Sequence, residues 1–143
     1  EGILEKIEAF LGKRKDTWTH KASLPGGDLG YKSIHDFTRA VQAEFPFLKQ
    51  KYVERLARLY GTNIKIILHK VTCTKDLGQD FGSGLYQREV EYLIEHEWAT
   101  TAEDILFRRT KIGLVMSTKN AAELEKFLRL NHAKLVKSKN KSK

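Results

Sequence analysis

The sequence has little cysteine and no long apolar run, and each shortage excludes a class of protein. Cys73 is the one cysteine among 143 residues, which excludes an internal disulfide and a zinc site built on cysteine pairs, as expected for a reducing compartment. No stretch of about 18 consecutive apolar residues occurs, so we expect no transmembrane helix. The chain begins at Glu1 without a basic and then apolar leader, so we expect no signal peptide and a piece excised from a longer protein.

The positive charge is concentrated at one end of the chain. The formal net charge is +8, but five lysines lie in the last ten residues, and removing their charge leaves +3 for the rest. Lysine, serine and asparagine cannot bury apolar surface, so we expect residues 137–143 to form a disordered basic tail behind one domain of residues 1–136. We interpret the tail as a solubilising terminus, with an arm that binds nucleic acid or anionic membrane as the alternative.

Apolar residues spaced three and four positions apart predict about seven helices. The helical segments are Ile3–Leu11, the run from Ser33 to Pro46, Tyr52–Tyr60, Ile64–Leu68, Leu85–Glu97, the run after Thr101, and a last helix that begins near Thr118 to Asn120. Ile64–Leu68 is short enough to be a strand by pattern alone, and we assign it to a helix because its neighbours are helical. The sum predicts an all-α fold, a single compact domain that forms an orthogonal or irregular bundle.

Local signals indicate where some of these helices begin, end and face the core. Ser33 with Asp36 is typical of an N-terminal cap, Gly61 of a helix end, and Leu24-Pro25-Gly26-Gly27-Asp28 of a turn. In the helix before Gly61, the predicted apolar face is Tyr52, Leu56, Leu59 and Tyr60, and Arg55 lies off that face. In the last helix, the predicted apolar residues are Leu124, Phe127, Leu128, Leu130 and Leu135.

Two motifs resemble ligand sites but are incomplete. The glycines at 78, 82 and 84 could bring backbone N–H groups close to a phosphate, yet no strand precedes them and no Gly-Lys-Ser/Thr triplet follows. We therefore interpret them as a glycine-shaped helix entry. His96-Glu97 matches half of a zinc-protease helix, but the second ligand would be residue 100, which is Thr100. No metal site is expected.

The run from His96 to Gly113 is unusually dense in charge and aromatic surface. Thr101 with Asp104 predicts a capping box, and Arg108 and Arg109 follow in the same helix. We expect the arginine pair to form ion pairs with Glu91, Glu95 or Glu97 that fix how helices pack, because an unpaired buried charge costs several kcal/mol. An anion site built on the two arginines is the alternative.

These residues carry a family resemblance. The segments Leu24–Asp28, Arg55–Thr62 and His96–Ala99, the run Arg108-Arg109-Thr110-Lys111, and Leu77-Gly78 with Phe81-Gly82 and Leu85-Tyr86 stand in the same order and spacing as in one known domain. Across roughly residues 17–117 the chain resembles the C-terminal domain of FAD-dependent, quinone-linked glycerol-3-phosphate dehydrogenase.

The resemblance implies a parent enzyme that oxidises sn-glycerol 3-phosphate to dihydroxyacetone phosphate, passing a hydride to FAD and electrons to membrane quinone. The flavin fingerprint has no counterpart here, so the FAD and substrate domains are expected upstream and no catalytic, cofactor-binding or metal residue is assigned. Mitochondrial members of the resembled family continue into calcium-binding helix-loop-helix units, and no such loop motif occurs here, so we expect a bacterial-type enzyme. The resemblance implies that the parent is cytoplasmic and peripheral on the inner membrane. A related branch, the glycerophosphate oxidases, uses oxygen instead.

We therefore expect a helical cap that packs on the parent's FAD and substrate domains and is inactive alone. The structural or interdomain candidates are His96, Glu97, Trp98, Arg108, Arg109 and Lys111. The parent, rather than this domain alone, would bind quinone and the membrane surface. We also expect that the parent can form a homodimer. Nucleic acid is not an expected partner. An independent basic helical module that binds nucleic acid or anionic membrane is the alternative function.

Overall fold

The computed structural model describes residues 19–31 and 33–139, together with Ile3, Lys6, Ile7, Phe10 and Gly12. This part of the chain is helical and contains no β-strand, apart from an isolated antiparallel bridge between Asp80 and Tyr86. The elements are η1 (Thr19–Lys21), α2 (Ile34–Glu44), α3 (Gln50–Tyr60), η2 (Gly61–Asn63), α4 (Ile64–Ile67), η3 (Thr74–Leu77), α5 (Gln87–His96), η4 (Asp104–Arg109), η5 (Ile112–Leu114) and α6 (Thr118–Lys139).

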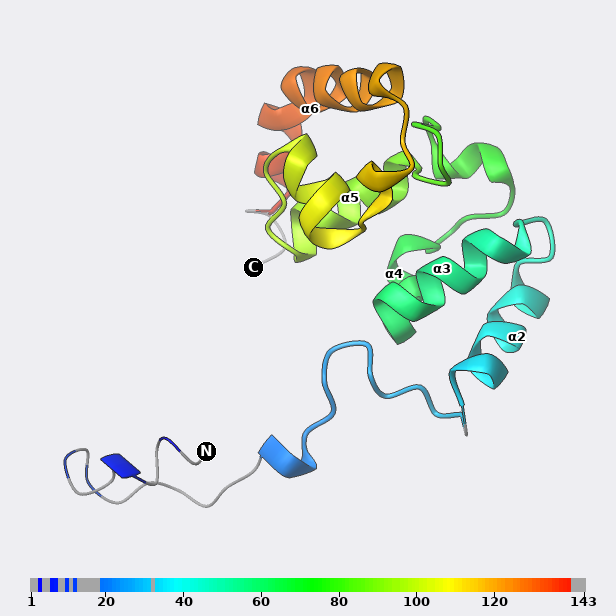
Figure 1. Cartoon of the computed structure of the whole chain (residues 1–143). Coiled ribbons are helices and arrows are strands. Elements are labelled where there is room, and N and C mark those ends of the chain that lie inside the picture. The colour runs from blue at the N-terminus through cyan, green and yellow to red at the C-terminus, as the bar shows by residue number, and fades with distance from the viewer. Residues whose placement is uncertain are drawn as a thin grey trace.

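The helices pack as two pairs joined through a short connector. α2 packs against α3, α5 packs against α6, and the single-turn α4 contacts both α3 and α5. Figure 1 shows the α2–α3 pair in cyan and green on one side and α5 beneath the orange α6 on the other. The predicted all-α, single-domain fold is confirmed.

The described residues hold five α-helices where about seven helices were expected. The segment after Thr101 is a π-helical turn, η4, because the Thr110 N–H bonds the Ile105 carbonyl five residues back at 3.0 Å. Most of the predicted helix Ile3–Leu11 lies outside the described residues, although Ile3, Lys6, Ile7 and Phe10 are helical.

The predicted start of α2 and end of α3 are confirmed. The Ser33 hydroxyl accepts a hydrogen bond from the Asp36 N–H at 3.1 Å, and α3 ends at Gly61 with a φ of 52°. The predicted apolar face of α3 is wrong at Leu59, which is exposed, while Val53 and Ala57 are buried with Tyr52, Leu56 and Tyr60. The face is rotated because α3 is covered by α2 and also by η2 and α4.

The predicted turn around Pro25 is confirmed, and it is fastened to the end of α3. The Thr62 N–H bonds the Gly26 carbonyl at 3.0 Å, and the Gly27 N–H bonds the Leu24 carbonyl at 2.7 Å. A Cβ at Gly26 would lie 2.3 Å from the Tyr60 carbonyl oxygen, and one at Gly61 would lie 1.9 Å from the Gly26 carbonyl oxygen. Both positions have positive φ, so each needs glycine for conformation and for space.

The last two predicted helices differ from the structure at their ends. α5 starts at Gln87 rather than Leu85, because Leu85 is held in a turn by bonds to Gly82 and Phe81. In α6, Leu124 and Leu128 are buried as expected, but the prediction of Leu130 as an apolar-face residue is wrong, since it is exposed. α6 runs to Lys139, three residues into the segment expected to be a basic tail, and residues 140–143 lie outside the described part.

α3 and α5 are joined inside the core by an ion pair. Glu89 of α5 is fully buried, and its two carboxylate oxygens accept hydrogen bonds from Nη1 and Nη2 of Arg55 at 2.7 and 2.6 Å. Nη2 also donates to the Gly84 carbonyl at 2.6 Å, and the Tyr60 hydroxyl donates to Glu89 at 2.7 Å. Because both carboxylate oxygens and the guanidinium are satisfied, the buried charges can coexist in the core.

The ionisation of the surrounding groups follows from this pair. Burial lowers the pKa of the Arg55 guanidinium, but the hydrogen bonds and charge of Glu89 outweigh burial and the net shift is upward. Burial first, and then the Glu89 carboxylate, raise the pKa of the Tyr60 hydroxyl above its ordinary value. The upward shift favours the neutral Tyr60 hydroxyl, the form that donates to Glu89.

We predict that Glu89→Ala lowers the free energy of unfolding by about 3–5 kcal/mol, because it leaves the Arg55 charge without a partner in the core. Urea unfolding followed by circular dichroism measures the loss. Glu125→Ala, which removes the exposed i,i+4 pair of Glu125 with Arg129 on α6, is the matched control and should cost about 0.5 kcal/mol or less. Equal losses for the two variants would contradict the role given to the buried pair.

Candidate functional site

The candidate residues His96 to Lys111 lie in one segment that leaves α5, turns twice and returns through η4. Trp98 has a φ of 56° and Lys111 a φ of 60°, so two left-handed residues bracket the segment. Ala99, Ile105 and Leu106 anchor it in the core, while Trp98 and Phe107 are exposed. The segment thus has a fixed backbone and an exposed apolar surface.

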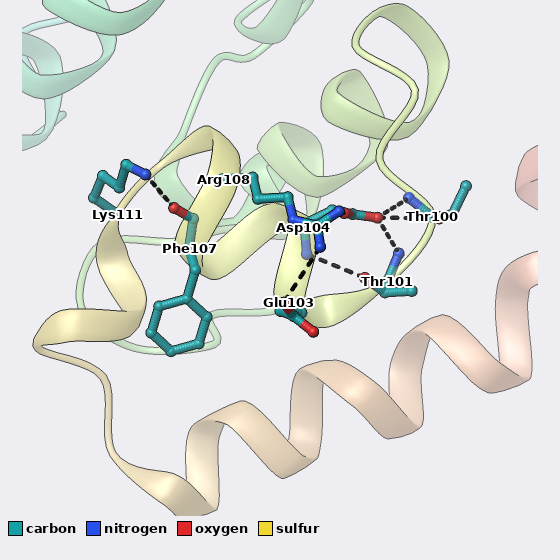
Figure 2. A network of polar contacts seen from close by, with 7 residues as sticks. All are labelled: Thr100, Thr101, Glu103, Asp104, Phe107, Arg108 and Lys111. Atoms are coloured by element: carbon teal, nitrogen blue, oxygen red, sulfur yellow. Dashed lines mark hydrogen bonds and ion pairs between the residues drawn. The ribbon is translucent and has the colours of Figure 1, made fainter.

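The start of η4 is capped from both sides, as the sequence predicts. Oδ2 of Asp104 accepts hydrogen bonds from the N–H groups of Thr100 and Thr101, each at 3.1 Å, and from the Thr100 hydroxyl at 3.0 Å (Figure 2). In return the Thr101 hydroxyl accepts from the Asp104 N–H at 3.1 Å. The N–H of Thr100 and the side chain of Thr101 lower the pKa of Asp104 to about 2. The predicted capping box is confirmed.

The same arrangement occurs a second time, before η3. Oδ2 of Asp76 accepts from the N–H and hydroxyl of Thr72, both at 2.8 Å, and from the N–H of Cys73 at 3.0 Å. These bonds, with those from Thr72 first, lower the pKa of Asp76 to about 2. Two loops of this domain are therefore closed by an aspartate four residues after a threonine.

Arg108 lies outside the core and pairs within its own turn. Its guanidinium meets Asp104 at 3.0 Å and Glu103 at 3.4 Å, and Figure 2 shows it between the two carboxylates. The expectation of a buried pair with Glu91, Glu95 or Glu97 is wrong for Arg108, because Asp104 and Glu103 lie one turn away on the same element. A guanidinium that already faces two carboxylates makes a poor anion site.

Arg109 and Lys111 take different roles. Arg109 is exposed, and its positive charge acts on the Glu97 carboxylate, one of its expected partners. The Lys111 Nζ donates to the Phe107 carbonyl at the end of η4, where a cation suits the helix dipole (Figure 2). The Phe107 ring reaches over Gly113, where a Cβ would lie 2.6 Å from it.

His96 and Glu97 reach a cleft at the corner where α3, α4 and α5 meet. We call it the corner cleft. Its volume is about 380 Å³ and its lining residues are Pro25, Leu59, Tyr60, Asn63, Ile66, Tyr92, His96 and Glu97. Three of the segments that carry the family resemblance, Leu24–Asp28, Arg55–Thr62 and His96–Ala99, therefore meet at one place.

Aromatic rings in series form one side of the corner cleft. The rings of Tyr60 and Tyr92 meet edge to face at 5.2 Å, and the His96 ring stacks on Tyr92 at 4.9 Å. Burial, and then the Glu97 charge, raise the pKa of Tyr92, while a hydrogen bond with Asn63 works in the opposite direction. Burial raises the pKa of Glu97, and the Arg109 charge lowers it. The cleft is thus bordered by a series of rings, mixed in polarity, and contains one carboxylate.

The residues that sequence reasoning missed are Arg55, Glu89 and Tyr60. Glu89 stands beside Val90 and four residues before Leu93, on the buried side of α5, and Arg55 stands beside Leu56 on α3. The position of Glu89 among the apolar residues of its helix was a signal that could have identified a buried charge. Arg55, which lies off the predicted apolar face of its helix, gave no comparable signal. The density of charge around Arg108 favoured Arg108 as the arginine of a buried ion pair, whereas the buried pair is formed by Arg55.

Within residues 19–31 and 33–139, no group of three His, Cys, Asp or Glu side chains is placed to hold a metal ion. None of the helices among the described residues is long and apolar enough to cross a membrane.

We predict that Thr101→Ala lowers the free energy of unfolding by about 1 kcal/mol, because it removes the N-terminal cap of η4. The same change should raise the pKa of Asp104 from about 2 toward its ordinary 3.8, measured by carbon-13 NMR titration. Thr72→Ala removes a hydroxyl that donates to Asp76 before η3. It serves as the control, because it should leave the titration of Asp104 unchanged. An unchanged Asp104 titration in Thr101→Ala would contradict the cap.

The cap also predicts a pH dependence. Because the folded pKa of Asp104 lies below its ordinary value, the ionised carboxylate stabilises the fold above pH 3.8, and this contribution is lost as pH falls toward 2. The difference in unfolding free energy between the unsubstituted protein and Asp104→Asn should therefore shrink over that interval. A difference that stays constant from pH 6 to about pH 2 would contradict this linkage.

Comparison with known proteins places the chain in one family. The family described as the C-terminal domain of alpha-glycerophosphate oxidase matches residues 17–142. The glycerol-3-phosphate dehydrogenase of Pseudomonas aeruginosa is 39% identical over 132 residues, which cover 92% of this chain and 26% of that protein. The aerobic glycerol-3-phosphate dehydrogenase of Escherichia coli is 33% identical over 128 residues, which cover 90% of this chain and 25% of that protein.

A third relative carries a different substrate in its name. The D-erythritol 1-phosphate dehydrogenase of Brucella abortus is 37% identical over 108 residues, which cover 76% of this chain and 22% of that protein. The chain thus spans about a quarter of the length of the curated relatives it matches. The family match covers nearly all of the chain and confirms the resemblance seen in the sequence. The chain belongs to the family of the C-terminal domain of alpha-glycerophosphate oxidase.

Proposed function

We propose that the chain is the C-terminal helical domain of a bacterial-type, FAD-dependent glycerol-3-phosphate dehydrogenase and that its own role is structural and interdomain. The family match over residues 17–142, with relatives of which the chain spans about a quarter, carries the proposal. The parent would oxidise sn-glycerol 3-phosphate to dihydroxyacetone phosphate. A hydride would pass from the substrate carbon to FAD, and a proton would leave the hydroxyl group on that carbon, so that a ketone forms.

The described residues do not fit a flavin. The glycine turn at 82–84, the best backbone cradle in the sequence, is already occupied by the protein itself. The Gly82 N–H donates to the Asp80 carboxylate at 2.7 Å, which would repel a phosphate, and the Gly84 carbonyl accepts from Arg55. A Cβ at Gly82 would meet the Asn120 amide at 1.9 Å, so this glycine serves packing against α6. The FAD site is therefore assigned to the upstream part of the parent, and no reaction step is assigned to this chain.

Glycerol 3-phosphate is proposed as the substrate because two of the relatives named above carry it in their names. The erythritol-phosphate relative is also a dehydrogenase named for a phosphorylated polyol. The choice between these polyol phosphates and between quinone and oxygen as acceptor would depend on the upstream domains. The parent would be a cytoplasmic enzyme that binds peripherally to the inner membrane, and it is also proposed to form a homodimer.

The proposal predicts a division of properties between the complete polypeptide and this domain. The complete protein should be yellow and should reduce a redox dye with glycerol 3-phosphate, and more slowly with D-erythritol 1-phosphate. The separate 143-residue chain should be colourless and inactive, because hydride transfer needs the flavin. Flavin absorbance or turnover in the separate chain would contradict the proposal, as would a complete protein that oxidises neither substrate.

The same preparation tests the alternative of a basic binding module. Binding of duplex DNA or of anionic vesicles that falls steeply with salt and disappears on deletion of residues 137–143 would favour that alternative. We expect no such binding at physiological salt, because five of the positive charges lie in the last ten residues and the rest of the chain carries only +3.

A further inference from the structure

The corner cleft is surrounded by large apolar side chains that are exposed. Leu59 and Ile66 line it and are 41% and 48% exposed. Leu24, which precedes the lining residue Pro25, and Trp98, which follows the lining residue Glu97, are 80% and 72% exposed. These residues come from four different elements or loops, so no single amphipathic helix explains them. A gathering of apolar surface around a concavity is typical of a binding face.

The cleft is also preformed. Tyr60 is held by its hydrogen bond to the buried Glu89, and Tyr92 and His96 are stacked in series beside it. The Leu24–Gly27 turn at the edge is fixed by the bond from the Thr62 N–H to the Gly26 carbonyl. A surface that is already ordered loses little conformational entropy when a partner binds.

Glu97 is the carboxylate among the residues that line the cleft. It is half-buried, and burial is the largest influence on its pKa, which is raised. A partly desolvated carboxylate of this kind is stabilised by a donor from outside the domain. The partner should therefore bring a cation or an N–H group as well as apolar side chains.

The path of the chain indicates where that partner comes from. Residues 19–31 lead directly into the cleft, and Pro25 is one of its lining residues. The family is named as a C-terminal domain, and the chain spans about a quarter of its relatives. A part of the parent that precedes this chain would be tethered to the domain through the segment that passes the corner cleft, and this tether would raise its effective concentration there.

The charge of the cleft argues against a membrane as the occupant. Its lining contains a glutamate and no lysine or arginine, so it does not complement an anionic lipid surface.

We propose that the corner cleft is the docking face for the upstream body of the same polypeptide. That body would seat apolar side chains on Leu59, Ile66 and Trp98 and place a cationic or N–H donor on Glu97. The inference rests on the proposed function, because it requires a parent with an upstream body, and it adds which face of the domain is covered and by what chemistry.

Thiol labelling of the complete polypeptide tests the docking face. In a Cys73→Ser background, Leu59→Cys and Ile66→Cys are compared with Leu130→Cys, which lies on α6 and is 70% exposed. Modification is followed peptide by peptide with mass spectrometry, and each rate is divided by its rate in urea. Residues 59 and 66 should react at least about tenfold more slowly than residue 130, because labelling would require the interface to open. Similar normalised rates at all three positions would overturn the proposal.

A charge reversal tests the chemistry of the partner. Glu97→Arg should raise the labelling rate at Ile66→Cys by at least about tenfold, because it places two cations together at the interface. Glu125→Arg on α6 is the matched control and should leave the rate unchanged. Circular dichroism shows whether the Glu97→Arg domain stays folded. If Glu97→Arg unfolds the domain, the labelling rates of Leu59→Cys and Ile66→Cys with Glu97 in place decide the proposal. No effect of a folded Glu97→Arg variant would overturn the part assigned to Glu97.

Other occupants and the parent's activity give distinguishable outcomes. Protection that disappears on dilution of the protein would identify a second copy as the occupant, and protection that appears only with anionic vesicles would identify a membrane; either result overturns the docking face. Oxidation of glycerol 3-phosphate is measured on the same samples. A protein that oxidises glycerol 3-phosphate but whose thiols at residues 59 and 66 react as fast as the one at residue 130 refutes the docking face alone. A protein that is inactive but whose thiols at residues 59 and 66 are protected refutes the proposed function alone.

Discussion

The structure depends most on the buried ion pair between Arg55 and Glu89. It joins α3 to α5, two helices that are 34 residues apart at this contact, and it lies where the two helix pairs of the domain meet. Removing two charges from water is costly, and the pair is tolerated because both carboxylate oxygens and the guanidinium find several partners. Such a pair permits few alternative arrangements of the helices, since sliding either one would leave a charge without its partners.

The pair also shapes the surface. Tyr60 donates to Glu89 inside the core and exposes its ring side to the corner cleft, where Tyr92 and His96 continue the series of rings. The Gly26 and Gly61 backbones touch at the end of the same helix and fix the turn that brings the preceding chain to this corner. The buried charges, the aromatic series and the glycine contact thus form one continuous arrangement from the core to the proposed docking face.

Local signals predicted local structure well. Ser33, Gly61, the Pro25 turn and the pairing of Thr101 with Asp104 are each decided by atoms within a few residues, and all were confirmed. Leu59 and Leu130 were placed wrongly, because which face of an amphipathic helix is covered depends on the partners that pack on it. The π-helical form of η4, which includes the bond from the Thr110 N–H to the Ile105 carbonyl five residues back, is not revealed by the periodicity of the sequence.

The candidate site was predicted only in part, for a related reason. The run from His96 to Lys111 identified the family, and His96 and Glu97 do reach the corner cleft, but Arg108 turned out to be paired within its own turn. Arg55 and Glu89 looked like ordinary charged residues of separate helices, and only the tertiary structure brings them together. A resemblance between sequences does not indicate which residues form such a pair.

A double-mutant cycle between Arg55 and Glu89 tests the central claim most directly. Arg55→Met, Glu89→Leu and the double variant are unfolded in urea, and the interaction free energy is obtained from the four values. If the pair holds α3 against α5, the two substitutions should be strongly non-additive, with a coupling of about 2 kcal/mol or more, and the double variant should be more stable than either single variant. Additive losses, with a coupling below about 0.5 kcal/mol, would contradict the account.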